Sequence, residues 1–147
     1  MTTHAVTRQQ ASAAIAQLVP RILQGVQLNF FVTRRTTQTQ LLVLVAIHAA
    51  ERCTMGQLAT NLHVSMPTMT GVVTRLARAG YVRRTTSPDD RRQVVVELTA
   101  KGREFIQAFQ AVIRHRWEEV LRALSPYELE AFYRVITKLQ AQLQPTH

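Results

Sequence analysis

The sequence is poor in cysteine, glycine and histidine pairs, and each shortage excludes a class of protein. Its 147 residues contain one cysteine, Cys53, so neither an intrachain disulfide nor a cysteine metal cluster can form. The five glycines form no glycine-rich phosphate-binding loop, and the five histidines include no pair at metal-ligand spacing. These absences argue against an enzyme, a metal site and a bound cofactor.

Long apolar runs are also missing. The longest, LLVLVAI at residues 41–47, is far shorter than the ~20 residues that a membrane-spanning helix needs. The first ten residues, MTTHAVTRQQ, lack the basic-then-apolar order of a signal peptide. We therefore expect a cytoplasmic protein without a membrane partner, and the single cysteine agrees with a reducing compartment.

Positive charge is what the sequence has in excess. Eighteen Lys and Arg against nine Asp and Glu give a net charge of +9, which favours a polyanionic partner such as nucleic acid or an acidic membrane surface. Hydrophobic residues make up 46% of the chain, enough for one sizeable core. We expect one compact domain, or one core with a small appendage.

Apolar spacing and capping signals predict two helices in the first third of the chain. The first should span about residues 8–32, and Pro20 inside it should kink or split it. Thr37 and Gln40 then stand at capping-box spacing before a second, buried helix in residues 37–53. The residues expected to share one face of that helix are Leu41, Leu44, Val45 and His48.

Two shorter helices follow, joined by a very short turn. Thr54 and Gln57 repeat the capping spacing before LATNL, and Ser65, with Pro67 in the first turn, opens SMPTMTGVVTRLARAG. Gly80 can supply the left-handed cap at the end of the second helix. This arrangement is typical of a helix-turn-helix, whose second helix enters the DNA major groove. An ordinary pair of packed helices with a solvated outer face is the alternative.

A basic hairpin comes next, at residues 81–98. The residues at 81–86 and 93–98 favour strands, with Val94, Val96 and Leu98 on one face, and SPDDRR joins them. Arginines at a hairpin tip contribute almost nothing to a core. Such a wing can lie along the phosphate backbone or reach into the minor groove. The alternative is a solvated turn whose arginines only keep the surface soluble.

Two amphipathic helices complete the chain. Thr99 caps one of about six turns, and Ser125, Pro126 and Glu128 open another. Their apolar stripes exceed what a small winged core could cover, so they belong either to a dimer interface or to an intramolecular helical core. The stripe of the last helix holds Leu129, Phe132, Ile136, Leu139 and Leu143.

The run from Thr54 to Gly102 resembles the winged-helix core of the MarR family of bacterial transcription regulators. The most specific feature is an aspartate, one residue and an arginine, then a β-branched stretch and LT..G. Here that pattern is supplied by Asp90, Arg92, Leu98, Thr99 and Gly102. The resemblance covers most of residues 36–143.

The resemblance implies a fold that is mostly α with a small β-hairpin wing (α+β). It also implies a homodimer on double-stranded DNA, bound at a pseudo-palindromic operator. We therefore expect a helical dimerisation region at residues 1–35 and 99–147 and a winged helix-turn-helix lobe at 36–98. Each copy would place one helix in the major groove and one wing in the minor groove.

By position in the family pattern, Arg92 is the minor-groove arginine of the wing tip. Asp90 would pair with a neighbouring basic group and hold the loop in shape. Many family members have an arginine where this chain has Gly71, so a phosphate or base contact is either missing here or taken up by Arg75 or Arg78. Arg83 and Arg84, lower on the wing, are better suited to phosphate contact than to sequence reading. The recognition-helix contacts would come from Ser65, Pro67, Thr68, Thr70 and Arg75.

The leading hypothesis is therefore a sequence-specific regulator, a repressor released by a ligand. The family implies a small aromatic or amphipathic effector between the helical region and the winged lobes. Such a ligand would change the ~34 Å spacing that two half-sites demand. The sequence does not identify the pocket.

Three other interpretations stay open. Oxidation of Cys53 could make the protein a thiol sensor. The alternative is that Cys53 is only a small, buried hydrophobic side chain. The chain could instead be a sequence-indifferent architectural DNA-binding protein, or a protein-interaction module whose charge serves solubility.

Overall fold

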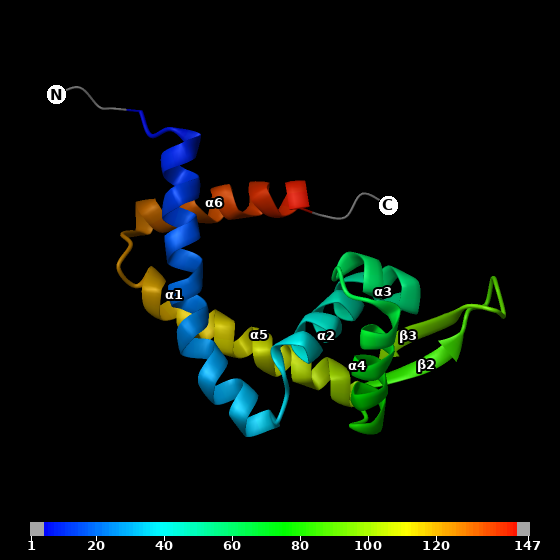
Figure 1. Ribbon diagram of the computed structural model, residues 1–147. Coiled ribbons are helices and arrows are strands. Elements are labelled where there is room, and N and C mark those ends of the chain that lie inside the picture. Colours follow the sequence, from blue (N-terminus) through cyan, green and yellow to red (C-terminus); the bar gives the residue numbers. More distant parts are fainter. Residues whose placement is uncertain (1–4, 144–147) are drawn as a thin grey trace.

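The computed structural model describes residues 5–143, apart from the side chains of residues 25–29 and 32. Within this part, the chain is mostly helical and carries a small antiparallel sheet at one end (Figure 1), so the expected fold class is confirmed. The expected dimerisation region also includes residues 1–4 and 144–147, which lie outside the described residues. The helices are α1 (Arg8–Arg34), α2 (Gln38–Ala50), α3 (Met55–Asn61), α4 (Met66–Arg78), α5 (Ala100–Leu121) and α6 (Pro126–Leu143). The strands are β1 (Arg52–Thr54), β2 (Val82–Thr86) and β3 (Val94–Leu98).

The helices begin where the capping residues predict. The Thr37 hydroxyl accepts a hydrogen bond from the Gln40 amide, and the Gln40 side-chain oxygen accepts one from the Thr37 amide. Thr54 and Gln57 repeat this capping box. Each box satisfies two amide donors that would otherwise lack a partner at the helix start. The capping signals therefore fix where the two helices begin.

Pro20 does not split the first helix, contrary to one form of our expectation. The helix α1 continues through it from Arg8 to Arg34, and Figure 1 shows one helix that bends along its length. Proline removes the donor for the carbonyl of Ala16. Both residues are exposed in this chain, so water can satisfy that carbonyl without breaking the helix.

The strand β1 was not expected from the sequence. We had extended the second helix to Cys53, but α2 ends at Ala50, where the positive φ of Glu51 (61°) turns the chain out of the helix. The strand order is β1-β3-β2, with Cys53 opposite Val96 and Arg83 opposite Glu97. The wing is thus a three-stranded sheet at its base, and β3 has a neighbour on both edges.

The helix α2 buries a different face from the one expected. Val43 and Ile47 have no exposed surface, whereas Val45 is 39% exposed and His48 is exposed. The prediction was wrong for Val45 and His48, because α2 packs against α4, α5 and the sheet at once. A helix that is packed on several sides buries residues outside a single apolar stripe, so the stripe alone does not predict which residues are buried.

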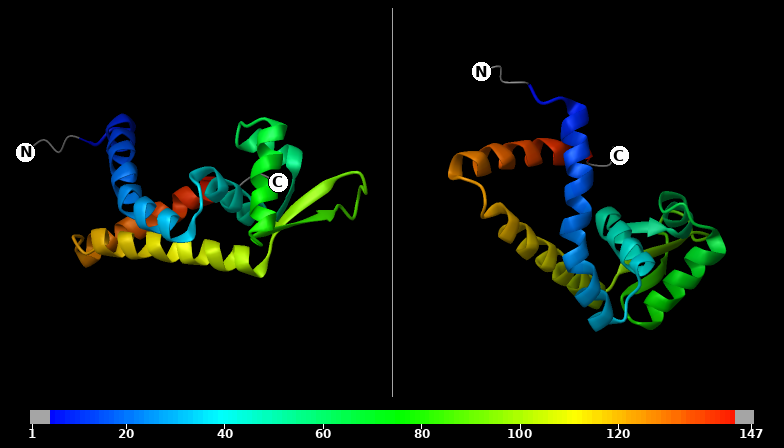
Figure 2. Two further views of the ribbon diagram at one scale, coloured as in Figure 1. Left: turned by 60° about the horizontal axis from the view of Figure 1, so that its bottom comes forward. Right: turned by 60° about the vertical axis from the view of Figure 1, so that its left-hand side comes forward.

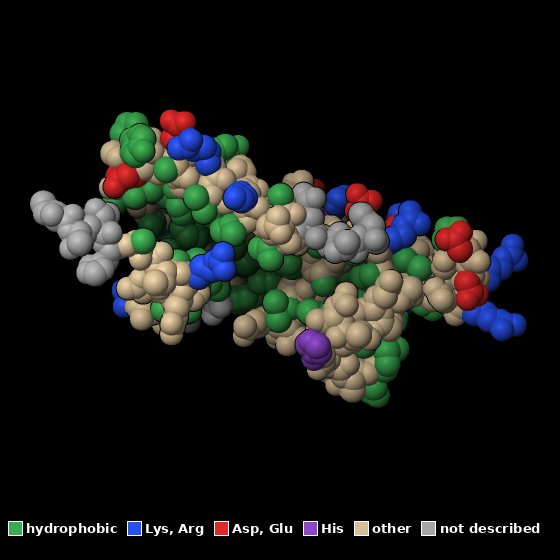
Figure 3. Space-filling model, turned by 90° about the horizontal axis from the view of Figure 1, so that it is seen from above, with side chains coloured by type: hydrophobic (Ala, Val, Ile, Leu, Met, Phe, Trp, Pro, Cys, Tyr) green, Lys and Arg blue, Asp and Glu red, His purple; other side chains and the backbone are tan. Residues whose placement is uncertain are grey.

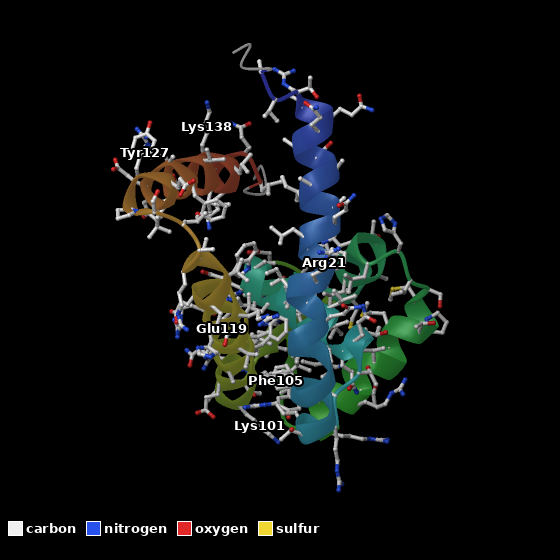
Figure 4. The ribbon with its side chains drawn as sticks, turned by 90° about the vertical axis from the view of Figure 1, so that its left-hand side faces the viewer. Arg21, Lys101, Phe105, Glu119, Tyr127 and Lys138 are labelled. Atoms are coloured by element: carbon white, nitrogen blue, oxygen red, sulfur yellow. The ribbon has the colours of Figure 1, made fainter. Side chains whose placement is uncertain are left out.

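The main core extends from the sheet into the first turns of α5 and the last turns of α1. The ring of Phe30 in α1 lies 5.1 Å from that of Phe105 in α5, and the Arg34 guanidinium lies 4.9 Å from the centre of the Phe30 ring. Figure 4 shows Phe105 between these two helices. The lobe and the long helices therefore share one core. Its largest fully buried side chains are Phe105, Leu44, Ile47, Leu58, Met69, Leu76 and Ile106.

The far ends of the long helices contrast with this core. The helix α6 has no buried residue, and residues 8–21 of α1 are all exposed. Figure 2 shows these segments extending away from the winged lobe.

Candidate nucleic-acid interface

The helix α4 presents a polar face opposite its buried one. Met69, Val72, Val73 and Leu76 point into the core, and this division explains why the apolar residues repeat at three-to-four spacing. The five residues of α4 and its cap that we expect to contact DNA are all exposed: Ser65, Pro67, Thr68, Thr70 and Arg75.

Ser65 serves first as the helix cap. Its hydroxyl accepts a hydrogen bond from the Thr68 amide at 3.3 Å and lies 2.8 Å from the Thr68 hydroxyl. The start of α4 therefore carries two linked hydroxyls beside the partial positive charge of a helix N-terminus, which favours an anion such as phosphate.

Arg75 lies back along α4 over Gly71. Its Nε donates to the Gly71 carbonyl at 3.2 Å, and its Nη2 lies 3.7 Å from where a Cβ on Gly71 would be. The Arg75 guanidinium thus lies over the helix surface at Gly71, where there is no side chain. That Arg75 takes up a DNA contact of an arginine at position 71 stays a prediction.

The wing tip is organised by backbone hydrogen bonds. Asp90 accepts from the Arg92 amide through its side chain (2.9 Å) and from the Gln93 amide through its carbonyl (3.0 Å). We had expected the Asp90 carboxylate to pair with a basic side chain, but the described ion pairs do not include it. Asp90 shapes the loop through the amide of Arg92, whose side chain stays exposed. Figure 3 shows Lys and Arg side chains projecting at this end of the molecule.

The two arginines of the wing stem have partners within the protein. Arg83 in β2 pairs with Glu97 in β3, with 2.5 Å between Nε and Oε1. Arg84 donates from Nη2 to the Thr74 hydroxyl at 2.8 Å and to the Thr70 carbonyl at 3.4 Å, both on α4. The structure therefore connects the wing to the recognition helix, which the sequence did not show.

The LT..G motif is a joint rather than a contact surface. Thr99 caps α5 by accepting from the Gly102 amide, and its hydroxyl donates to the Gly80 carbonyl at 2.6 Å. A Cβ at Gly102 would lie 2.1 Å from the Tyr81 carbonyl oxygen, so only glycine fits. Gly80 itself has a φ of +80°, as expected for a left-handed cap. These residues hold the wing and α4 against the start of α5.

A cavity of about 370 Å³ lies between α2, β3 and α5. Its lining mixes carboxylates, a guanidinium and an apolar side chain. The sequence did not identify it, because three distant segments meet there. The lining residues are His48, Glu51, Glu97, Leu98 and Arg103.

Cys53 is buried in β1 with 6% of its surface exposed. Burial raises the pKa of its thiol to about 11 from an ordinary 9.0, because a thiolate would lose its hydration. Since the thiolate is the reactive form, this environment argues against the thiol-sensor interpretation.

The described residues contain no group of three or more His, Cys, Asp or Glu that could hold a metal ion. Among the helices described, none is both long and apolar enough to cross a membrane.

Comparisons with known proteins agree with this geometry. Residues 36–94, from the residue before the α2 cap to the first residue of β3, match the profile of the MarR family. A curated relative, the HTH-type transcriptional regulator YfiV of Bacillus subtilis (strain 168), is 29% identical over 105 residues. The match covers 71% of this chain and 66% of that relative's length.

Solved structures share the fold over nearly the whole chain. RV1404 from Mycobacterium tuberculosis has a TM-score of 0.78 at 20% identity, covering 99% of this chain and 100% of its own. A MepR mutant from S. aureus, bound to an oligodeoxyribonucleotide, has a TM-score of 0.67 at 21% identity, covering 95% and 100%. The chain is therefore similar to the MarR family over residues 36–94, and it shares the fold of these solved structures over nearly its whole length.

Proposed function

We propose that the chain acts in the cytoplasm as a homodimeric, sequence-specific transcription regulator. It would bind a pseudo-palindromic operator and act as a repressor that a small aromatic or amphipathic ligand releases. The observation that carries the proposal is the exposed, hydroxyl-rich face of α4 beside an arginine-bearing wing. Proteins of this family are transcription factors and not enzymes, so the chain is not an enzyme.

The DNA contacts divide by chemistry. Thr68 and Thr70 on α4 carry short hydroxyls that suit base edges or phosphates in the major groove. Arg92 would enter the minor groove, since its flat, weakly hydrated guanidinium suits a narrow groove of negative potential. Figure 1 shows the wing projecting beyond α4, as two adjacent contacts on one duplex require. The MepR mutant of the same fold is bound to an oligodeoxyribonucleotide, which supports DNA as the partner.

The dimer is supported by the apolar surface of the long helices. Ile15 in α1 is 52% exposed, and Val135 and Leu143 in α6 are 55% and 83% exposed. Figure 3 shows hydrophobic side chains gathered in a hollow at the end of the molecule away from the wing. A second copy of the chain would cover this surface and place two recognition helices at a fixed spacing. Residues 1–35 and 99–147 would then form the dimerisation region, and residues 36–98 the DNA-binding lobe.

The cavity between α2, β3 and α5 is the candidate site for the effector. The 370 Å³ cavity lies where the lobe, through α2 and β3, meets α5 of the helical region. Its size suits a small ligand, and Arg103 could bind an acidic group. A ligand there that preferred another angle between lobe and helices would lower the affinity for DNA through its differential affinity for the two states.

Selection of bound fragments from random DNA, using the purified full chain, tests the proposal. We expect an inverted repeat with half-sites about one DNA turn apart, preferred over random duplex by on the order of 10³ or more. Candidate aromatic acids are then added to the recovered site, and release of DNA identifies an effector.

Each contrary result points to a different function. Tight binding without sequence preference would identify an architectural protein. No binding to any duplex at low salt would overturn the DNA-binding role and leave an interaction module. An affinity that did not fall steeply with salt would exclude several phosphate contacts per copy, since each should contribute roughly 0.9 to the log slope.

A further inference from the structure

The two neighbouring arginines of β2 have opposite surroundings. Successive side chains of a strand point to opposite faces of the sheet, so Arg83 and Arg84 cannot serve the same partner. Arg83 is paired across the sheet with Glu97. Arg84 lies on the face that packs against α4, where it reaches Thr70 and Thr74.

The contacts of Arg84 connect the wing to the part of α4 that includes Thr70 and Thr74. Thr70 and Thr74 are one helical turn apart, so a single guanidinium nitrogen holds two successive turns. Thr70 is also one of the residues we expect to contact DNA. Arg84 therefore fixes the base of the wing to the helix segment that lies directly beneath those contacts.

The electrostatics of the two arginines differ in the same way. The carboxylate of Glu97 neutralises Arg83, whereas among the described ion pairs none involves Arg84, whose partners are a hydroxyl and a carbonyl. A charged donor on a neutral hydroxyl makes a directional bond stronger than one between two neutral groups. This bond orients the wing without cancelling positive charge near the DNA surface.

We propose that Arg84 is a positioning residue, and that its bond to Thr74 sets the angle between the wing and the recognition helix. This inference rests on the proposed DNA-binding function. Arg92 at the wing tip and the α4 hydroxyls must engage adjacent grooves together, so a change of angle at the base misplaces one of them. Arg84 would then act through geometry, instead of the phosphate contact that its charge alone suggests.

The test uses the Thr74→Val variant of the full chain, because valine keeps the shape of threonine and removes only the hydroxyl. We expect operator affinity to fall roughly threefold to tenfold, as for the loss of one ordinary hydrogen bond. The slope of log affinity against log salt should stay as in wild type, because no phosphate contact is lost. Thr74→Ser, which keeps the hydroxyl, should bind like wild type.

Two double variants separate positioning from direct contact. In an Arg84→Gln background, Thr74→Val should have no further effect if Thr74 acts through Arg84. In a Thr74→Val background, Arg92→Ala should cost less than in wild type, because the wing is already misplaced. The urea midpoint of Thr74→Val should match wild type, which separates a change in the wing angle from a loss of fold.

Several outcomes would overturn the inference. Thr74→Val binding like wild type would show that the bond has no role in DNA binding. A full loss from Thr74→Val in the Arg84→Gln background would identify Thr74 as a direct DNA contact. A salt slope that fell by about 0.9 in Arg84→Gln, with Thr74→Val unchanged, would make Arg84 a phosphate contact. Wild type binding no duplex would overturn the proposed function as well, and so is distinguishable from these.

Discussion

The winged lobe and the distal helical arms, α6 and residues 8–21 of α1, have similar apolar side chains but opposite burial. Val43, Met69 and Val96 in the lobe have no exposed surface. In the arms, Val135 is 55% and Leu143 is 83% exposed. Because an apolar side chain favours folding only when it leaves water, the lobe can support its own structure and the arms cannot. The same kind of amphipathic pattern thus forms a buried core in one region and an exposed apolar surface in the other.

The largest expected effect is on the joint between the lobe and α5. Gly102→Ala would place a Cβ 2.1 Å from the Tyr81 carbonyl oxygen, and backbone on both sides must move to relieve the clash. We expect the free energy of unfolding to fall by about 4 kcal/mol, measured by urea denaturation of the full chain.

Gly56→Ala is the matched control. A Cβ at Gly56 would meet only the Thr54 hydroxyl, at 3.9 Å, and the site is helical. Alanine there should be neutral or stabilising by up to about 1 kcal/mol. Similar losses from both variants would show that the tight joint at Gly102 is unimportant.

The second effect concerns the arms alone. Leu139 in α6 is 45% exposed and lies in the apolar stripe that a second copy would cover. Leu139→Glu would bury two charges per dimer, so we expect the dimer to weaken by about 3 kcal/mol, more than a hundredfold. Sedimentation measures this shift, and the far-UV circular dichroism of the variant should remain that of wild type.

Ala141→Glu adds the same charge on the opposite face of α6 and serves as the control. Ala141 is exposed and lies outside the stripe. If both variants dimerise like wild type, or both dissociate, the stripe is not the interface and the arms need another explanation.

The features of the lobe that depend on neighbouring residues could be predicted from the sequence, whereas those that depend on contact between distant segments could not. The capping boxes at Thr37 and Thr54 could be found because donor and acceptor lie within one turn. The strand β1 was missed because three residues, Arg52–Thr54, show no alternation and become a strand only by pairing with β3. A short edge strand is defined by its neighbour more than by its own residues.

At the candidate site, too, local features could be predicted from the sequence and contacts between elements could not. Exposure of the α4 hydroxyls was predictable from helical periodicity. The partner of Arg84 was not, because it depends on how α4 packs against β2. For Asp90 we expected a basic side chain as the partner that holds the wing loop, whereas its side chain accepts from the Arg92 amide, a contact that depends on the turn geometry.

The third effect concerns Arg92 at the wing tip, compared with its neighbour Arg91. Arg92→Ala should weaken operator binding by about 1–3 kcal/mol if its side chain reaches base edges in the minor groove. Arg91→Ala is the control, since Arg91 is its exposed neighbour and carries the same charge. Equal small losses from both variants, measured by titration of labelled operator, would reduce Arg92 to a general source of positive charge.

The smallest expected effect is at Cys53. Because burial raises the pKa of its thiol to about 11 from 9.0, the folded state holds this proton more tightly than the unfolded state. The stability from this site is therefore complete below pH 9 and is lost as the pH rises through 11. Wild type should lose stability relative to Cys53→Ala over that window in urea titrations. At neutral pH the thiol stays protonated, so peroxide-treated and untreated protein should bind the operator equally. A loss of binding that a thiol reductant reverses, and that Cys53→Ser does not show, would instead make the buried sheet a redox sensor.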